Sequence, residues 1–426
     1  MRSSWLLFAL AGCFHPTHAS LAPIRDEAVA NEKRPANPES WNLDRAAAIQ
    51  YALAHGPDLA DRRDQEAVAE AKIGAAKQLT NPQLHLGQTT EEDLLVGEQT
   101  RFVVAFRVFP DMPWALDARI AQARAGYEAE RAVTTSAKLA LIAQIEQLYA
   151  QLAFGQATHD ILAKEATVLG ERRRVLNAQL AHNTATRLEV MLADQDFADI
   201  TTTITSIELA TTRQTTHLSQ LLGIPPGQTW KPVIDLADEQ KIHTGYVKGD
   251  LEAKAFARPE LAKLQAQADA ADASAYQEKT KRIPWLDNIQ VERSVRDNVE
   301  WAASASITLP LFSLNSGRIA AAEAQRTQYA NERRRLAIDT VRAVDDAVNL
   351  VEVTGKRAKD LADQLAPATS ELDQLFAAEK TAAIADPVKL LLLEERYVRA
   401  QRAMLDAGFD HRMAVIALEA LVGGTP

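Results

Sequence analysis

The chain is poor in the residues that most enzyme and redox sites need. Its only cysteine is Cys13, so an internal disulfide and a paired-cysteine metal site are both excluded. No glycine-rich phosphate loop, HExxH zinc motif or GxSxG nucleophile motif occurs in the sequence. We therefore expect a protein that is not an enzyme, with no catalytic residues, no cofactor and no bound metal.

Long hydrophobic runs and basic stripes are also missing. No run of about 20 apolar residues follows residue 20, so we expect no membrane-spanning helix. The net charge of -10 leaves no basic surface to neutralise phosphates, which argues against nucleic acid as a partner. Aromatic residues are only 6% of the chain, and Ala, Leu, Gln, Glu and Arg dominate long stretches. Such a composition is typical of long helices and coiled coils.

The first residues have the pattern of an export signal. Arg2 precedes a short apolar segment, and Leu10-Ala11-Gly12-Cys13 resembles the lipobox of bacterial lipoproteins. This pattern predicts a signal peptide over 1–12, a covalent lipid on Cys13 and a tether over 13–40. Since one lipidated residue anchors a protein weakly, further membrane contact is expected. An ordinary signal peptide cut after Ala19 is the alternative.

An internal repeat relates the two halves of the chain. Gly56-Pro57-Asp58-Leu59-Ala60 recurs as Arg258-Pro259-Glu260-Leu261-Ala262, and five further matches follow in order at offsets of 199 to 202 residues. The repeat predicts a first unit over 41–223, an equatorial linker over 224–256 and a second unit over 257–426.

Each unit has the same expected plan. A helix from Pro57 to about Thr80 ends at Asn81-Pro82, because proline cannot continue a helix. Alternating apolar residues predict strands over 83–90 and 100–108, with a polar loop over 91–99 between them. In the second unit the strands are expected over 285–293 and 300–309.

A helix of unusual length should follow the strands. Residues 115–181 contain no proline, and leucines such as Leu141 and Leu176 fall on one heptad seam. The returning helix carries a second seam from Val190 to Leu221, so we expect an antiparallel coiled coil. Met191 and Leu391–Leu393 are assigned to its core.

The turns between these helices carry capping signals. Asn183 suits a left-handed residue at the end of the long helix, and Thr186 with Glu189 forms a capping box for the return helix. In the second unit Asp386 is the expected cap and Pro387 the first helical residue. The tips of the two hairpins are therefore placed near 183–187 and 383–387.

Taken together, this pattern resembles the TolC-type outer-membrane efflux protein family over about residues 41–423, above all its lipid-anchored members that serve resistance-nodulation-division pumps. The carriers of the resemblance are Leu43-Asp44-Arg45-Ala46, Leu53-Ala54-His55-Gly56-Pro57-Asp58-Leu59, Asn81-Pro82-Gln83-Leu84, Arg258-Pro259-Glu260-Leu261, Leu309-Pro310-Leu311-Phe312 and the closing Leu-Leu-Gly and Leu-Val-Gly.

The resemblance implies a mainly α protein with a small β part. Long antiparallel coiled-coil helices would form a periplasmic tunnel, and four strands per chain would join in a trimeric transmembrane β-barrel. The protein would be a homotrimer in the outer membrane, in contact with its lipids and extending into the periplasm. It would work as a passive exit duct for small molecules or metal ions, with a periplasmic adaptor protein and an inner-membrane pump as partners.

Residues at the tips are the candidate sites. We expect the adaptor to dock on Thr186, Arg187, Leu188, Asp386, Pro387 and Val388. Asn183 and Ala383 stand where the family usually has glycine, and Lys389 replaces an acidic residue. The candidate pore constriction is formed by Glu371, Asp373 and Glu379, although each of them taken singly is better explained as part of an ordinary solvated helix face. His182 with Glu189 is better explained as a surface histidine than as a metal site.

Three other functions fit parts of this pattern. The exit duct of a type I protein secretion system would share the whole architecture. A soluble periplasmic coiled-coil scaffold would result if the strands were misassigned, and a helical enzyme would need a cofactor of which the sequence gives no sign.

Overall fold

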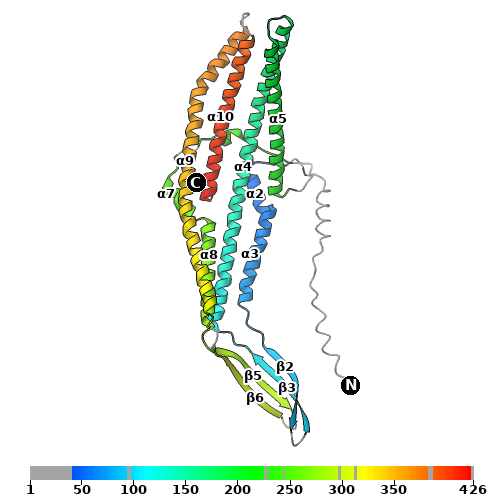
Figure 1. Ribbon diagram of the computed structural model, residues 1–426, viewed down its shortest axis with the longest axis vertical. Coiled ribbons are helices and arrows are strands. Elements are labelled where there is room, and N and C mark those ends of the chain that lie inside the picture. Colours follow the sequence, from blue (N-terminus) through cyan, green and yellow to red (C-terminus); the bar gives the residue numbers. More distant parts are fainter. Residues whose placement is uncertain are drawn as a thin grey trace, which may run out of the picture.

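The protein is a long helical rod with a β-sheet at one end (Figure 1). The computed structural model describes residues 41–93, 97–224, 228, 230–242, 245–295, 299–310, 314–381 and 387–423. The helices are α2 (Arg45–His55), α3 (Pro57–Ala76), α4 (Pro113–Ala181), α5 (Arg187–Leu222), α6 (Leu236–Glu239), α7 (Lys248–Phe256), α8 (Pro259–Thr280), α9 (Ser316–Thr381) and α10 (Pro387–Val422). The strands are β1 (Trp41–Leu43), β2 (Gln83–Asp93), β3 (Gly97–Val108), β4 (Trp230–Pro232), β5 (Trp285–Val295) and β6 (Val299–Thr308). The prediction of a mainly α protein with few strands is confirmed.

Four strands form an antiparallel sheet in the order β2-β3-β5-β6. The inner pair joins the two halves of the chain, with Phe102 opposite Val295 and Val108 opposite Ile289. Within the described residues β2 and β6 each have a neighbour on one side only. Their outer edges therefore present backbone N–H and C=O groups without a strand partner.

The strands extend further than the sequence suggested. The predicted loop over 91–99 is mostly strand, because β2 continues to Asp93 and pairs there with Gly97. Likewise β5 reaches Val295 and β6 begins at Val299. Acidic and polar residues disfavour a buried strand, but they are compatible with the exposed end of a hairpin whose backbone still pairs. Helix α3 in turn ends at Ala76, a few residues before the predicted end at Thr80.

The rod is built on the 69-residue helix α4, against which α3, α5, α8 and α10 all pack. Leu162, Leu169 and Ile200 form one buried layer between α4 and α5, and Leu176, Val190 and Ala193 form the next one toward the tip. The assignment of Met191 to this core was wrong, because its side chain is 61% exposed. Val190 and Ala193 face α4, and a residue next to Val190 points about 100° away from it. Leu392 is exposed as well.

Two short helices share one side of α4 and meet midway. Gly56 precedes α3 and Gly223 follows α5, with φ of 69° at Gly223. A Cβ at Gly223 would lie 2.8 Å from the carbonyl oxygen of His55, so no larger residue fits without a shift. Gly223 thus allows both the left-handed backbone conformation at the end of α5 and the close approach of α3.

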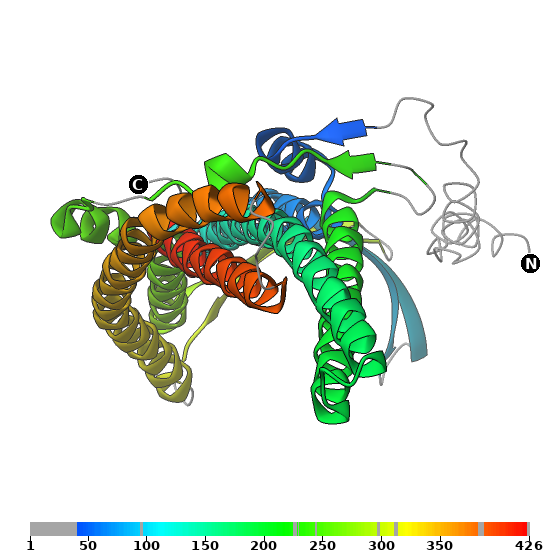
Figure 2. The same ribbon diagram turned by 90° about the horizontal axis from the view of Figure 1, so that it is seen from above.

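A belt of buried residues surrounds this midpoint. Leu59, Ile145, Leu152, Leu218 and Leu222 form its core, and Tyr149 donates a hydrogen bond to the carbonyl oxygen of Leu43 over 2.9 Å. Seen along the long axis, the helices form a curved wall and not a closed bundle (Figure 2).

The predicted linker over 224–256 contains regular secondary structure. It contains β4, which pairs in parallel with β1 through Trp41 and Trp230, and the helices α6 and α7. None of the helices in the described part of the chain combines the length and the apolar character needed to cross a lipid bilayer.

Candidate functional site: a two-faced sheet and two hairpin tips

One face of the four-stranded sheet is mainly apolar. The strand register places Leu84, Phe106, Val291 and Ala303 in one row that crosses all four strands. The neighbouring rows on this face are Leu86, Val104, Arg293 and Trp301, and Gln88, Phe102, Val295 and Val299. Exposure is high there: Leu84 is 64% exposed and Trp301 69%. Soluble proteins rarely expose an apolar patch of this extent.

The opposite face of the sheet is polar. Its rows are Gln83, Arg107, Gln290 and Ser304; His85, Ala105, Glu292 and Ala302; and Gly87, Val103, Ser294 and Glu300. Arg107 donates through Nη2 to the Gln290 side-chain oxygen at 2.6 Å, and Arg101 pairs with Glu300 over 2.6 Å. Alternation of apolar and polar residues with a period of two is the pattern of a barrel strand between lipid and an aqueous lumen.

Tryptophans mark the junction between sheet and helices. The rings of Trp114 and Trp285 lie edge to face with centroids 5.0 Å apart, and Trp285 Nε1 donates to the Pro110 carbonyl oxygen at 2.8 Å. This pair sits at one end of the sheet, while Phe102 and Trp301 lie in the two of the three apolar rows that are furthest from it. Aromatic residues at both ends of an apolar band are typical of the two water interfaces of a membrane.

The first hairpin tip lies at the far end of the rod from the sheet, between α4 and α5 (Figure 1). Asn183 adopts φ of 60°, and Thr184 N donates to the Gln179 carbonyl oxygen at 2.9 Å. Thr186 and Glu189 form both hydrogen bonds of a capping box. The hydrogen bonds from Thr186 hold the pKa of the Glu189 carboxyl below its ordinary value.

The side chains around this turn are exposed. Leu188 is 65% exposed, Thr186 and Arg187 are exposed beside it, and Leu192 lies one turn further along α5. The first half of the predicted docking set therefore forms one accessible surface. Its role in docking stays a prediction.

The second tip lies largely outside the described residues. Asp386 is among the residues left undescribed, and so are the side chains of Pro387 and Val388, although Pro387 is the first residue of α10. Of the three constriction candidates, Glu371 is exposed on α9, whereas the side chains of Asp373 and Glu379 lie outside the described residues. Cys13 lies outside them too.

A cluster of charges is buried at the middle of the rod. Arg412 on α10 donates to Glu239 on α6 at 2.6 Å, and both side chains are about 6% exposed. Arg45 on α2 pairs with Glu239 as well, and with Asp238 at 2.7 Å. The cluster therefore joins the linker to both halves of the chain. Burial raises the pKa of the neighbouring Glu146 carboxyl, and the Glu419 carboxylate raises it further.

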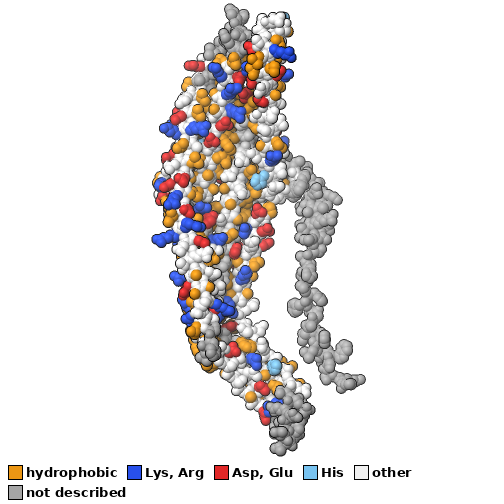
Figure 3. All heavy atoms as spheres, viewed as in Figure 1, with side chains coloured by type: hydrophobic (Ala, Val, Ile, Leu, Met, Phe, Trp, Pro, Cys, Tyr) orange, Lys and Arg blue, Asp and Glu red, His pale blue; other side chains and the backbone are white. Residues whose placement is uncertain are grey.

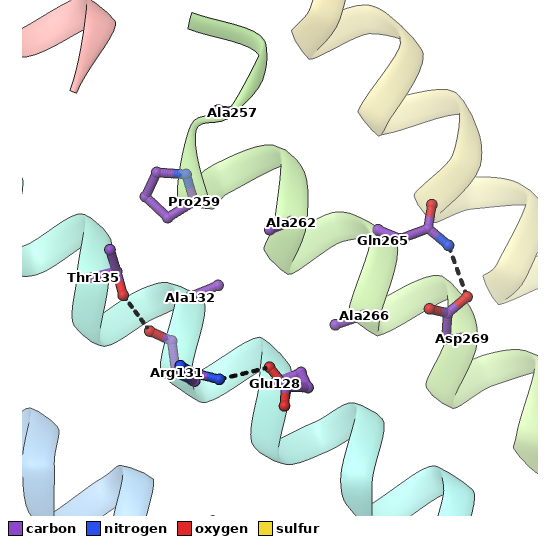
Figure 4. Close-up of a pocket in the computed structure, with 10 residues that line it drawn as sticks. All are labelled: Glu128, Arg131, Ala132, Thr135, Ala257, Pro259, Ala262, Gln265, Ala266 and Asp269. Carbon is purple, nitrogen blue, oxygen red and sulfur yellow. Dashed lines mark hydrogen bonds and ion pairs between the residues drawn. The ribbon is translucent and has the colours of Figure 1, made fainter. Parts of the chain in front are cut away.

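The face of the rod seen in Figure 3 carries charges of both signs. Lys and Arg are interspersed there with Asp and Glu along the helices. A shallow groove of about 440 Å³ lies between α4 and α8, with Ala132 and Ala266 on its walls (Figure 4). At its rim Arg131 pairs with Glu128 at 3.7 Å, and Gln265 donates to Asp269 at 2.7 Å. Since its polar side chains already pair with each other and point along the rim, the groove has no convergent set of ligand-binding groups.

Sequence reasoning missed the charge cluster. Arg45 and Glu239 are 194 residues apart, and Glu239 and Arg412 are 173 residues apart. Only the short acidic segment Asp235–Glu239 in an otherwise irregular stretch hinted at an ordered linker, because Asp235 caps α6.

This chain is similar to known proteins in its three-dimensional structure. No protein-family model matches the sequence. A comparison with curated proteins finds no match either. Solved structures of outer-membrane channels are similar over nearly the whole chain. CusC has a TM-score of 0.72 at 17% identity and covers 92% of this chain and 95% of its own.

Two further structures agree. The open state of the MtrE outer membrane channel of Neisseria gonorrhoeae has a TM-score of 0.70 at 16% identity, covering 93% of this chain and 94% of its own. The outer membrane protein VceC of Vibrio cholerae has a TM-score of 0.68 at 18% identity, covering 89% of this chain and 96% of its own. The chain therefore has the fold of the TolC-type outer-membrane channels, as the resemblance in its sequence predicted.

Proposed function

We propose that this protein is the outer-membrane exit duct of a tripartite efflux system. Three copies would close their sheets into one twelve-stranded barrel, and their helices would line a tunnel in the periplasm. The duct conducts passively and is not an enzyme. A periplasmic adaptor and an inner-membrane pump would deliver small molecules or metal ions to it.

The observation that carries this proposal is the two-faced sheet with unpaired edges. Backbone groups at an open edge cannot be left in lipid, so a spanning sheet must close on itself or on other copies. Four strands are too few for a barrel by themselves, whereas three copies give an even number in the range of outer-membrane barrels. Strands β2 and β6, with 11 and 10 residues, match in length for this closure. Twelve strands leave an aqueous lumen, since eight are just filled by side chains.

The helical rod supports the same function. A 69-residue helix is roughly 100 Å long, far more than a compact domain needs. Its curved wall would become a tunnel when repeated around a threefold axis (Figure 2). The tip at Thr186, Arg187 and Leu188 lies at the end away from the membrane, where an adaptor would dock. We place Asp386, Pro387 and Val388 in the corresponding second tip.

Planar-bilayer recording of the purified full-length protein tests the duct directly. We expect heat-resistant trimers on a gel and stable single-channel conductance. A protein that stays monomeric and never conducts would overturn the proposal. A Cys13→Ala variant tests the lipid anchor separately: it should lose the lipid, seen as a mass change, while its trimers still conduct.

A deletion strain tests the efflux role. Loss of the gene should sensitise cells to the cargo of its pump, and the wild-type copy should restore resistance. If instead a secreted polypeptide is retained in the deletion strain and resistance is unchanged, the protein is the exit duct of a type I secretion system.

A further inference from the structure

One charge within the described apolar rows of the sheet is not explained by the proposed duct. In the three rows that cross β2, β3, β5 and β6, whose side chains are all described, Arg293 is the single charged residue. It is exposed on β5, and the strand register places it directly between Val104 and Trp301. A guanidinium on a lipid-facing strand needs a partner, since an isolated charge in hydrocarbon is costly.

The described residues offer Arg293 no carboxylate. Its guanidinium lies over the Trp301 ring, 5.8 Å from the centroid. The arginines of the polar face differ, because Arg101 pairs with Glu300 and Arg107 with Gln290. Arg293 is therefore oriented by an aromatic ring, and no described carboxylate takes up its N–H donors.

The height of Arg293 on the sheet identifies the kind of partner. Only one more row, with Val295 and Val299, separates it from the hairpin end of β5 and β6. That end points away from the helical rod, so in the proposed duct it faces the outer leaflet (Figure 1). One row is two residues, or about 7 Å along a strand, which an arginine side chain can span by snorkelling. Trp301, 69% exposed, has the place of an interfacial tryptophan.

We propose that Arg293 and Trp301 form a binding site for the phosphate of an outer-leaflet lipid, once in each copy of the trimer. The guanidinium presents a planar fork of donors that matches phosphate oxygens in two hydrogen bonds. The Trp301 ring holds that fork in place and packs its edge against the lipid chains. This inference rests on the proposed function, because it needs the apolar face to lie in the outer membrane.

Native mass spectrometry of the full-length trimer, titrated with lipid A, tests the site. We expect Arg293→Gln to weaken binding about tenfold, the scale of a charge-assisted hydrogen bond. Trp301→Leu should weaken it less, because the charge stays while its orientation is lost. Dephosphorylated lipid A should bind wild-type and Arg293→Gln proteins equally.

Arg107→Gln is the matched control, since it removes a strand arginine from the polar face. It should leave lipid A binding unchanged. Conductance and heat-resistant trimers are measured on every variant. If all variants form conducting trimers and Arg293→Gln binds lipid A as tightly as the wild type does, the lipid site is overturned while the duct stands. If the wild-type protein itself forms no conducting trimer, the proposed function fails first.

Discussion

Arg412 and Glu239 form a buried ion pair across 173 residues of sequence, with Nε and Oε2 2.6 Å apart. Glu239 ends α6, a helix of four residues that could not be stable alone. The pair therefore fixes the linker against α10, and Arg45 fixes it against α2. These ion pairs therefore hold α2, α6 and α10 together at the middle of the rod.

Removal of Glu239 should loosen the linker. Glu239→Ala leaves Arg412 buried with no described carboxylate closer than that of Glu419, at 3.8 Å, and breaking one side of a buried pair costs roughly 3–5 kcal/mol. The free energy of local opening can be measured by amide hydrogen exchange in α6. Asp238→Ala is the control, because its pair with Arg45 is one-third exposed and is worth about 1 kcal/mol or less. Equal exchange rates for the two variants would contradict this role.

Stability should depend on pH through Glu146. Burial, and then the Glu419 carboxylate, raise the pKa of Glu146 above the ordinary 4.5. An acid with a higher pKa in the folded state binds more protons when folded, so folding becomes more favourable as the pH falls from above that raised pKa toward 4.5. Glu146→Gln should make the trimer more heat-resistant at neutral pH and reduce this gain on acidification. A variant with the same pH profile as the wild type would show that Glu146 does not cause it.

The two faces of the sheet can be separated by neighbouring substitutions on β6. Ala303 lies on the apolar face and Ser304 on the polar face, and both are exposed. Ala303→Arg should block assembly in the outer membrane, since an arginine facing lipid near the midplane costs about 2–4 kcal/mol in each copy. Ser304→Arg should assemble normally and shift ion selectivity toward anions. Fractionation, heat-resistant trimers and reversal potentials provide the measurements. Normal assembly of Ala303→Arg would mean that this face does not meet lipid.

If the protein is the proposed duct, loss of Arg172 should make it leak in its closed state. Its Nη1 lies 3.2 Å from Glu395 on α10 and 3.4 Å from Asp196 on α5, so it ties the two coiled coils together in the tip half of the rod. Arg172→Ala frees the helices to separate, and resting conductance in planar bilayers should rise. Arg174→Ala is the control, because the partner of Arg174 among the described residues is Glu171, also on α4. If the resting conductance of Arg172→Ala is unchanged, this contact does not help to keep the duct closed.

Local signals made much of this fold predictable from the sequence. The left-handed Asn183 and the box of Thr186 and Glu189 act within a few residues, and each has the backbone geometry or hydrogen bonds that its sequence indicates. The heptad seams could be predicted as well, because the burial of Leu162 and Leu169 requires only a neighbouring helix.

Contacts between segments that are far apart in the sequence could not be predicted from such local signals. The partner of Glu239 depends on how α10 lies against the linker, which no local pattern records. The strand ends were misplaced because side-chain polarity suggested a loop, whereas the backbone of Asp93 still pairs with that of Gly97. Arg293 was not singled out, since its meaning depends on the register that places it between Val104 and Trp301.

The open edges of β2 and β6 have a genetic consequence. If closure of each barrel requires the edge strands of two other copies, a chain that folds but pairs badly at its edges will assemble with wild-type chains and inactivate the complex. A variant damaged at either border, produced together with the wild-type protein, should therefore be dominant, whereas a variant that never folds should be recessive.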